Sequence, residues 1–173
     1  MRVLPYPSAF RLALGLLALL LTTPAWAADP VAEYEAIKRA SLKGIESLNV
    51  VVVAAKAESG CDRVSDEEIE TEVEARLERA GIPLAPDPVA YLFVSLVSVE
   101  PLKDLLCGFV VSVELQHVVR LVRDMRIMTF GMTWHRGGLG FASTSRTPDD
   151  VRRLLATLVD EFITVYLEQN PKP

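Results

Sequence analysis

Four consecutive valines, residues 50–53, set the strongest constraint on the fold of this chain. They lie in the uncharged run 48–55, and branching at Cβ suits valine to a pleated strand better than to a helix. A strand with one face in water normally alternates apolar and polar residues, which this run does not. The run therefore predicts an interior strand, buried on both faces of a sheet.

A helix is predicted after this strand, over residues 65–80. Ser65 and Glu68 have the spacing of a capping box, in which each side chain accepts from the other residue's backbone amide. The apolar positions that follow at helical spacing are Ile69, Val73, Leu77 and Ala80. The next strand, 89–99, is then expected to run parallel to the first, because the connection has the length of a βαβ crossover.

Two further strands are predicted over residues 109–122 and 127–135, with a short extension at 141–145. Short links join them to the strand before, so we expect them to be antiparallel. Strict alternation in 127–135 predicts two different faces. One face would carry Met128, Phe130, Met132 and Trp134, and the other Thr129, Gly131, Thr133 and His135. The glycine-rich segment 136–140 is predicted to be a turn.

The last predicted element is a helix over residues 147–169. Thr147 is the expected N-cap, with Pro148 at the first helical position and two aspartates at the positive end of the helix dipole. The element order is therefore β-α-β-β-β-α, and a short helix is also indicated within 29–47. This order predicts the α/β class, a two-layer sandwich with a four-stranded mixed sheet and two helices on one face.

Residues 1–27 have the pattern of a secretory signal peptide. Arginines at positions 2 and 11 precede an apolar run over residues 12–21. Ala25-Trp26-Ala27 after this run fits a cleavage site. An uncleaved anchor is the alternative, but a membrane-spanning helix needs roughly 20 apolar residues. We expect signal cleavage, a single α/β domain over 28–173, a periplasmic location and no stable membrane insertion.

Net charge narrows the classes of partner. The chain carries a formal charge of −5, and loss of the two leader arginines would take the mature chain to −7. Negative charge of this size argues against nucleic-acid binding and against adsorption to anionic lipid.

The chain has two cysteines, Cys61 and Cys107. Export permits a disulfide, and two cysteines allow one intramolecular pairing. A reactive thiol is the alternative, but neither cysteine lies in a C-x-x-C motif or close in sequence to a histidine. We expect a structural disulfide, which would contribute roughly 3–4 kcal/mol by restricting the unfolded chain.

No motif in the sequence supports catalysis. The two histidines, His117 and His135, have no partner at a metal-ligand spacing. The acidic run 66–74 is typical of a solvated helix face, and the glycines of 137–140 lack the lysine of a phosphate-binding loop. We therefore expect no enzymatic activity, no catalytic residue, no metal and no cofactor.

The sheet face opposite the two helices is the candidate interface. Aromatic side chains mixed with polar ones fit a protein-binding surface better than a solvated one. The candidate interface residues are Tyr91, Phe93, Val97, Glu114, Gln116, Thr133 and His135. The alternatives are that residues 29–47 fold over this face, or that it is a mildly apolar surface without a partner.

Three segments of the chain carry a resemblance. They are Val113-Glu114-Leu115-Gln116, then Thr133-Trp134 with the glycines at 137, 138 and 140, and finally Asp160-Glu161-Phe162 with Tyr166-Leu167 and Asn170-Pro171-Lys172. Together they resemble a group of short, exported bacterial proteins of uncharacterised function. The element order also resembles the amino-terminal domain of TolB and the curli-secretion lipoprotein fold. The resemblance implies an envelope role and supplies no catalytic residues.

The sequence thus predicts a non-enzymatic periplasmic protein that binds an unidentified envelope protein through an open sheet face. The alternative is a carrier of a small apolar or lipid-like ligand, held between the helix 147–169 and the sheet. A deep apolar cavity under that helix would favour the carrier. A flat, partly apolar sheet face would favour the binding module.

Overall fold

The computed structural model describes residues 29–55, 61, 64–86 and 88–171. The chain divides into two units, Met1–Glu35 and Ala36–Pro173. Helix α2, Pro30–Ala40, begins in the first unit and ends in the second. Everything described below belongs to the second unit.

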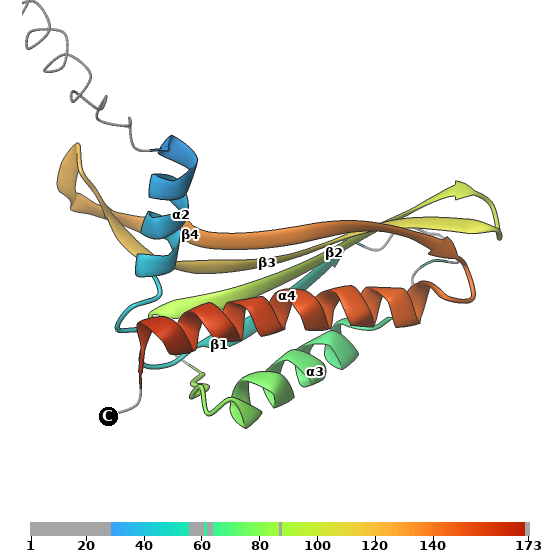
Figure 1. Cartoon of the computed structure of the whole chain (residues 1–173), viewed down its shortest axis with the longest axis horizontal. Helices are drawn as coiled ribbons and strands as arrows, with labels where there is room; N and C mark the ends of the chain where they lie inside the picture. The colour runs from blue at the N-terminus through green and yellow to red at the C-terminus, as the bar shows by residue number, and fades with distance from the viewer. Residues whose placement is uncertain (1–28, 56–60, 62–63, 87, 172–173) are drawn as a thin grey trace, which may run out of the picture. The chain divides into compact units, whose positions relative to one another are not determined.

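The second unit contains one four-stranded sheet and two long helices (Figure 1). Its elements are β1 (Asn49–Ala55), α3 (Asp66–Arg79), β2 (Ala90–Leu102), β3 (Leu106–Leu121), β4 (Asp124–Ser143) and α4 (Thr147–Gln169). The strand order is β1-β2-β3-β4, with β1 parallel to β2 and the other two pairs antiparallel. The mixed sheet and the element order predicted from the sequence are confirmed.

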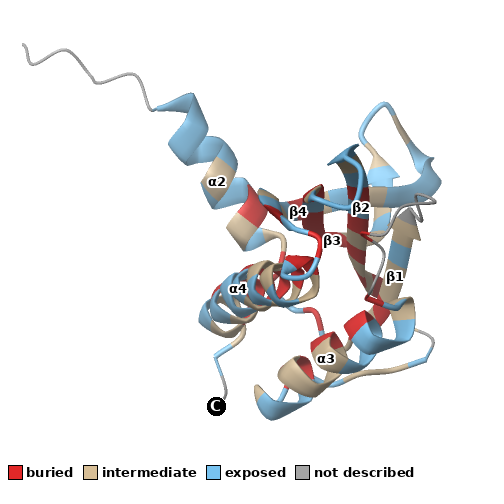
Figure 2. Cartoon of the chain, turned by 90° about the vertical axis from the view of Figure 1, so that its right-hand side faces the viewer, coloured by how far each residue is buried: buried red, intermediate tan, exposed pale blue. Residues whose placement is uncertain are grey.

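Helices α3 and α4 pack on the same face of the sheet, and the core lies between them and the strands (Figures 1 and 2). The strands contribute alternate residues to this core, among them Leu92, Val94, Leu96, Val111, Val113 and Leu115. The helices contribute Ile69, Val73, Leu77, Leu155, Val159 and Phe162. The protein is therefore a two-layer α/β sandwich, as predicted.

The prediction that 48–55 is an interior strand is wrong. β1 pairs with β2 alone and forms one edge of the sheet. Val50 is buried in the core, whereas Val53 is exposed on the face away from the helices. The run lacks polar residues because the valines on its outer face belong to an exposed apolar surface. An unbroken apolar run therefore fits an edge strand with such a face as well as a fully buried strand.

The predicted turn at 136–140 is also wrong, because β4 continues through it to Ser143. Gly138 and Gly140 lie opposite Val111 and Phe109 of β3. A Cβ atom at Gly138 would come 2.7 Å from Leu154 Cδ1, and one at Gly140 would come 2.6 Å from Phe109 Cε2. These glycines leave room for side chains of the core rather than reverse the chain.

A β-bulge at Thr133 corrects the predicted faces of β4. Trp134 lies opposite Leu115, but the next pair along the ladder is Met132 with Gln116, so Thr133 is an extra residue. Trp134 therefore points into the core and is 1% exposed, while Met132 and Phe130 are each 55% exposed. Unbroken alternation had placed all three on one face.

Both helix starts were predicted, one of them with the wrong cap. At α3 the Ser65 hydroxyl accepts from the Glu68 amide at 3.2 Å, and the Glu68 carboxylate accepts from the Ser65 amide at 3.0 Å. The capping box is thus confirmed. At α4 the N-cap is Arg146, and Thr147 is the first helical residue, whose hydroxyl donates to the Ser143 carbonyl at 3.0 Å.

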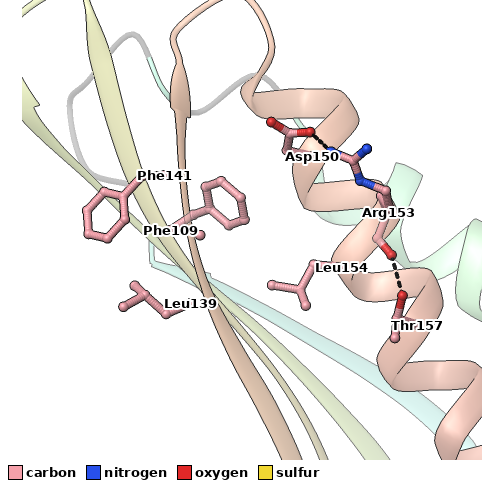
Figure 3. A pocket seen from close by; sticks show the side chains of 8 residues that line it. Phe109, Leu139, Phe141, Asp150, Arg153, Leu154 and Thr157 are labelled. Carbon is pink, nitrogen blue, oxygen red and sulfur yellow. Dashed lines mark hydrogen bonds and ion pairs between the residues drawn. The ribbon is translucent and has the colours of Figure 1, made fainter.

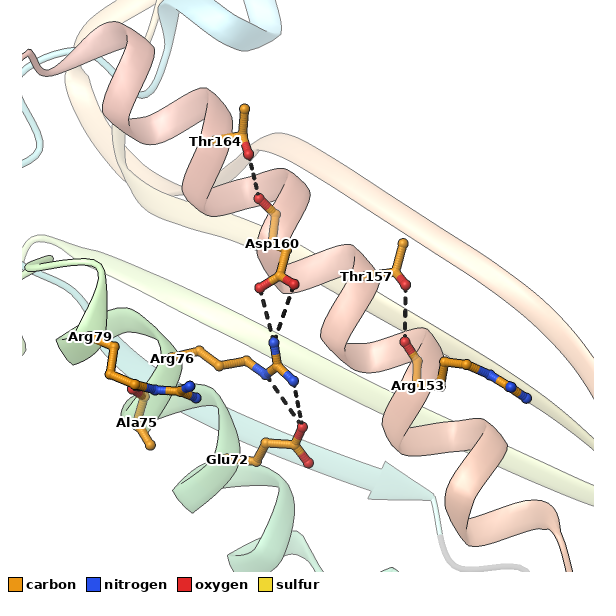
Figure 4. A network of polar contacts seen from close by, with 8 residues as sticks. All are labelled: Glu72, Ala75, Arg76, Arg79, Arg153, Thr157, Asp160 and Thr164. Atoms are coloured by element: carbon orange, nitrogen blue, oxygen red, sulfur yellow. Dashed lines mark hydrogen bonds and ion pairs between the residues drawn. The ribbon is translucent and has the colours of Figure 1, made fainter.

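Two further links hold the layers together. Cys61 and Cys107 are disulfide-bonded, as predicted, and tie the segment before α3 to the start of β3. Arg76 of α3 donates to Glu72 at 3.2 Å and to Asp160 of α4 at 3.0 Å (Figure 4). Because these ion pairs are partly solvated, they add less to stability than the apolar core beneath them.

The packing of Gly140 against Phe109 gives a test of the fold. We expect Gly140→Ala to lower the free energy of unfolding by about 1–3 kcal/mol, because the buried Phe109 ring has to move. Gly137→Ala is the matched control on the other face of β4, with a nearest contact of 3.3 Å, and should change it by less than about 1 kcal/mol. Urea unfolding measures both; equal destabilisation by the two substitutions would contradict this packing.

Candidate functional site

The sheet face away from the helices carries a large exposed apolar surface. We call it the open face, and the cross-strand register defines its members. They are Val51, Val53, Tyr91, Phe93, Val97, Val99, Val110, Glu114, Gln116, Met132, His135, Leu139 and Phe141. The strands hold these side chains on a rigid pleated support, so little conformational entropy is lost when a partner covers them.

The open face has an apolar strip at the end near the β2–β3 turn. Val97, Val110 and Leu139 form one row across three strands, and Val99 and Phe141 lie in the next row. Each of the five is between 43% and 65% exposed. The largest contiguous apolar patches on monomeric proteins cover about 300–600 Å² and often have a function, which makes this strip a candidate binding surface.

A polar centre borders this strip. The hydroxyls of Ser95 and Ser112 lie 2.8 Å apart, and Ser112 donates to Glu114 at 3.4 Å. The Gln116 side-chain amide donates to the other Glu114 oxygen at 3.3 Å. His135 is exposed and lies opposite Glu114 on β4. Both donors to the Glu114 carboxylate belong to its own strand, β3, and orient the carboxylate along that strand.

Six of the seven predicted interface residues share this face. Tyr91, Phe93, Val97, Glu114, Gln116 and His135 all belong to it. Thr133 does not, because it is the bulged residue, and its hydroxyl oxygen is buried. Its carbonyl accepts from the Ser41 hydroxyl at 3.3 Å, a contact between α2's following turn and the bulge.

Sequence reasoning missed part of the open face. Leu139 and Phe141 were assigned to a turn and to a short extension, because clustered glycines usually mark turns. Alternation places Met132 on the same face as Trp134, since nothing in the sequence of 127–135 indicates a bulge. The one available signal was the alternation of Leu139 and Phe141 with glycine, which is a strand pattern.

Residues 42–45 do not cover the open face. Tyr166 of α4 donates its hydroxyl to the Ile45 carbonyl at 2.6 Å, and Asn170 donates to the Leu42 carbonyl at 2.8 Å. The Gly44 amide in turn donates to Asn170 at 2.7 Å. This segment is therefore fastened to the carboxyl end of α4, on the helix side of the sheet.

A groove of about 390 Å³ lies where the predicted carrier site would be, between α4 and β4 (Figure 3). Phe109 and Leu154 fill the space between strand and helix, while Leu139 and Phe141 lie on the other side of the strand. An ion pair between Asp150 and Arg153 forms part of its wall. The groove is open and partly charged, unlike the enclosed apolar pocket that suits a lipid-like ligand.

Within the described residues, no group of three or more His, Cys, Asp or Glu side chains lies close enough to hold a metal ion. No helix in that same part of the chain is long and apolar enough to cross a bilayer.

His117 occupies the helix-facing side of β3, in phase with Leu115. It is half-buried and lies opposite Ala90 and Gly131. Burial lowers its pKa below the usual value of 6.5, because the charged imidazolium loses hydration there. His117 and His135 are on opposite faces of the sheet, so the two imidazoles cannot act together.

Comparisons with known proteins include a distant structural likeness. No protein family and no curated protein matches the sequence. The fold is similar to that of the hypothetical protein CT253 from Chlamydia trachomatis, at 11% identity and a TM-score of 0.42. The match covers 70% of this chain and 98% of that one. A likeness this distant says nothing about function.

The burial of His117 predicts a pH dependence. The unfolded chain binds the proton more tightly, so the free energy of unfolding should fall as the pH drops through about 6.5. NMR titration of the His135→Gln variant, in which His117 is the one remaining imidazole, measures the pKa directly. A midpoint at or above 6.5 would contradict the burial, and His117→Gln should remove this part of the pH dependence.

Proposed function

We propose that this protein is a non-enzymatic binding module of the bacterial envelope, which docks another protein through its open face. The observation that supports it best is the apolar strip formed by Val97, Val99, Val110, Leu139 and Phe141. Exposed apolar area of this extent contributes nothing to the core and is typical of a surface that a partner covers.

The chemistry of the strip indicates what kind of partner it fits. None of its five residues is charged, and the polar centre that begins with Ser95 and Ser112 borders it. An apolar centre with a polar rim is the usual arrangement of a protein–protein interface. The partner surface is thus expected to be apolar and close to neutral where it meets the strip.

An envelope location is part of the same proposal. The leader pattern of residues 1–27 supports export, and the buried Cys61–Cys107 disulfide is of the kind that persists in oxidising compartments. The two cysteines are 46 positions apart in the sequence. A disulfide that closes a loop of this length restricts the unfolded chain and thereby stabilises a small domain.

Site-specific photo-crosslinking in an exporting host tests the proposal. A photoreactive residue at Leu139 should give an adduct with a discrete protein, and one at Thr164, exposed on α4, should not. Val97→Asp in the same chain should weaken the Leu139 adduct by about tenfold or more, because it places a charge in the centre of the contact.

Val97→Asp should leave folding intact, since the side chain is exposed, and a change in unfolding free energy below about 1 kcal/mol checks this. Equal adducts from Leu139 and Thr164, or adducts that Val97→Asp leaves unchanged, would contradict the proposal. Adducts formed only between copies of this chain would contradict it too.

A further inference from the structure

β3 and β4 extend beyond the rest of the sheet as a two-stranded ribbon. The pairing of β2 with β3 ends at Ala90 and His117, whereas the β3–β4 ladder continues to Leu121 and Asp124. Residues 118–131 form this ribbon, and residues 122–123 form its turn. The ribbon is separate from the apolar strip, which lies at the opposite end of the open face.

The ribbon is apolar where a hairpin is normally polar. Turn positions usually carry Gly, Asn, Asp, Pro or Ser, but this turn is Val122-Arg123, and Val122 is 94% exposed. Neither residue has a positive φ, so the backbone does not explain the choice. The exposed apolar residues of the ribbon are Val118, Val122, Met125, Ile127, Met128 and Phe130.

The ribbon is also cationic in an acidic chain. It carries Arg120, Arg123 and Arg126 against Asp124, a net charge of +2, while the whole chain has −5. Arg126 forms an ion pair with Asp124 at 3.0 Å, and Arg120 donates to the Met125 carbonyl at 3.0 Å. Arg123, at the turn, is exposed.

We propose that the ribbon docks on an anionic phospholipid surface. Val122 and its apolar neighbours enter the boundary between headgroups and acyl chains, and the arginines bind lipid phosphates. The negative charge of the rest of the chain does not prevent this, because salt screens charges more than about 10 Å from the surface. The net negative charge of the chain predicts no adsorption to anionic lipid, whereas the positive charge of the ribbon favours it.

The shape of the ribbon favours lipid over an acidic protein as the ligand. A stable protein interface is a broad contact of about 800 Å² on each partner, whereas the ribbon is two strands wide and ends in the exposed turn Val122-Arg123. A lipid surface requires shallow burial of a few apolar side chains together with cationic groups. Methionine side chains, present at 125 and 128, adapt readily to a fluid surface.

Vesicle co-sedimentation tests this inference. The full chain is purified from a host that exports it, and its amino terminus is determined, since an uncleaved apolar leader would itself bind vesicles. Sedimentation is expected with vesicles of phosphatidylethanolamine and phosphatidylglycerol and not with vesicles of phosphatidylcholine alone. Val122→Asp and Arg123→Glu should each weaken binding by about tenfold or more.

Arg79→Glu is the matched control for Arg123→Glu. Both substitutions change the net charge by the same amount, but Arg79 lies at an exposed position of α3, outside the ribbon. It should keep binding within about twofold. A second readout is Met125→Trp, whose fluorescence should be quenched by brominated lipid, whereas that of Val99→Trp should not. Quenching of the first variant alone supports insertion of the ribbon.

Failure of the wild-type chain to sediment with the phosphatidylglycerol vesicles would overturn the inference. So would equal sedimentation with both vesicle types, or unchanged binding of Val122→Asp and Arg123→Glu. A photoreactive residue at Met125 that captures a protein, with no vesicle binding, would assign the ribbon to a protein partner instead. The Leu139 cross-link is independent of these results, so the two proposals fail separately.

Discussion

The extra residue in β4, Thr133, determines which side chains of this strand are buried. On one side of the bulge Trp134 points into the core, where its ring meets that of Phe162 edge-on at 5.2 Å. On the other side Met132 points outward, and Phe130 meets Tyr91 at 5.6 Å. Without the extra residue, alternation would direct Met132 and Phe130 to the same face as Trp134.

A core built on one face of the sheet leaves the other face available. Two amphipathic helices cover the inner side, and Gly138 and Gly140 let α4 and Phe109 approach β4 closely. The apolar residues that remain outside are not a by-product of this packing, since polar residues at Val97, Leu139 or Phe141 would leave the core unchanged. Their apolar character is therefore the observation on which the proposed binding function rests.

The apolar strip and the ribbon differ in chemistry, which is why we propose different ligands for them. The strip near the β2–β3 turn is uncharged, broad and supported by several strands. The ribbon at the other end is narrow and carries three arginines around exposed apolar residues. One chain could bind a membrane surface with the ribbon and a protein with the strip.

Most of the architecture could be predicted from the sequence, because it depends on local signals. The capping box at Ser65 and the apolar periodicity of α4 lie within single elements. The position of β1 at the edge and the course of β4 through its glycines depend on neighbours in space. Six of the candidate interface residues follow from simple alternation, whereas Thr133 and Met132 depend on a bulge that alternation cannot reveal.

Methionine oxidation tests the bulge most directly. Met128 and Met132 are exposed in the folded protein, so dilute peroxide should oxidise both within about threefold of their rates in the urea-unfolded chain. Mass spectrometry of the peptides separates the sites. If the alternation of β4 instead continued unbroken through Thr133, Met132 would lie beside Trp134 in the core, and strong protection of Met132 in the folded protein would contradict the outward face described here.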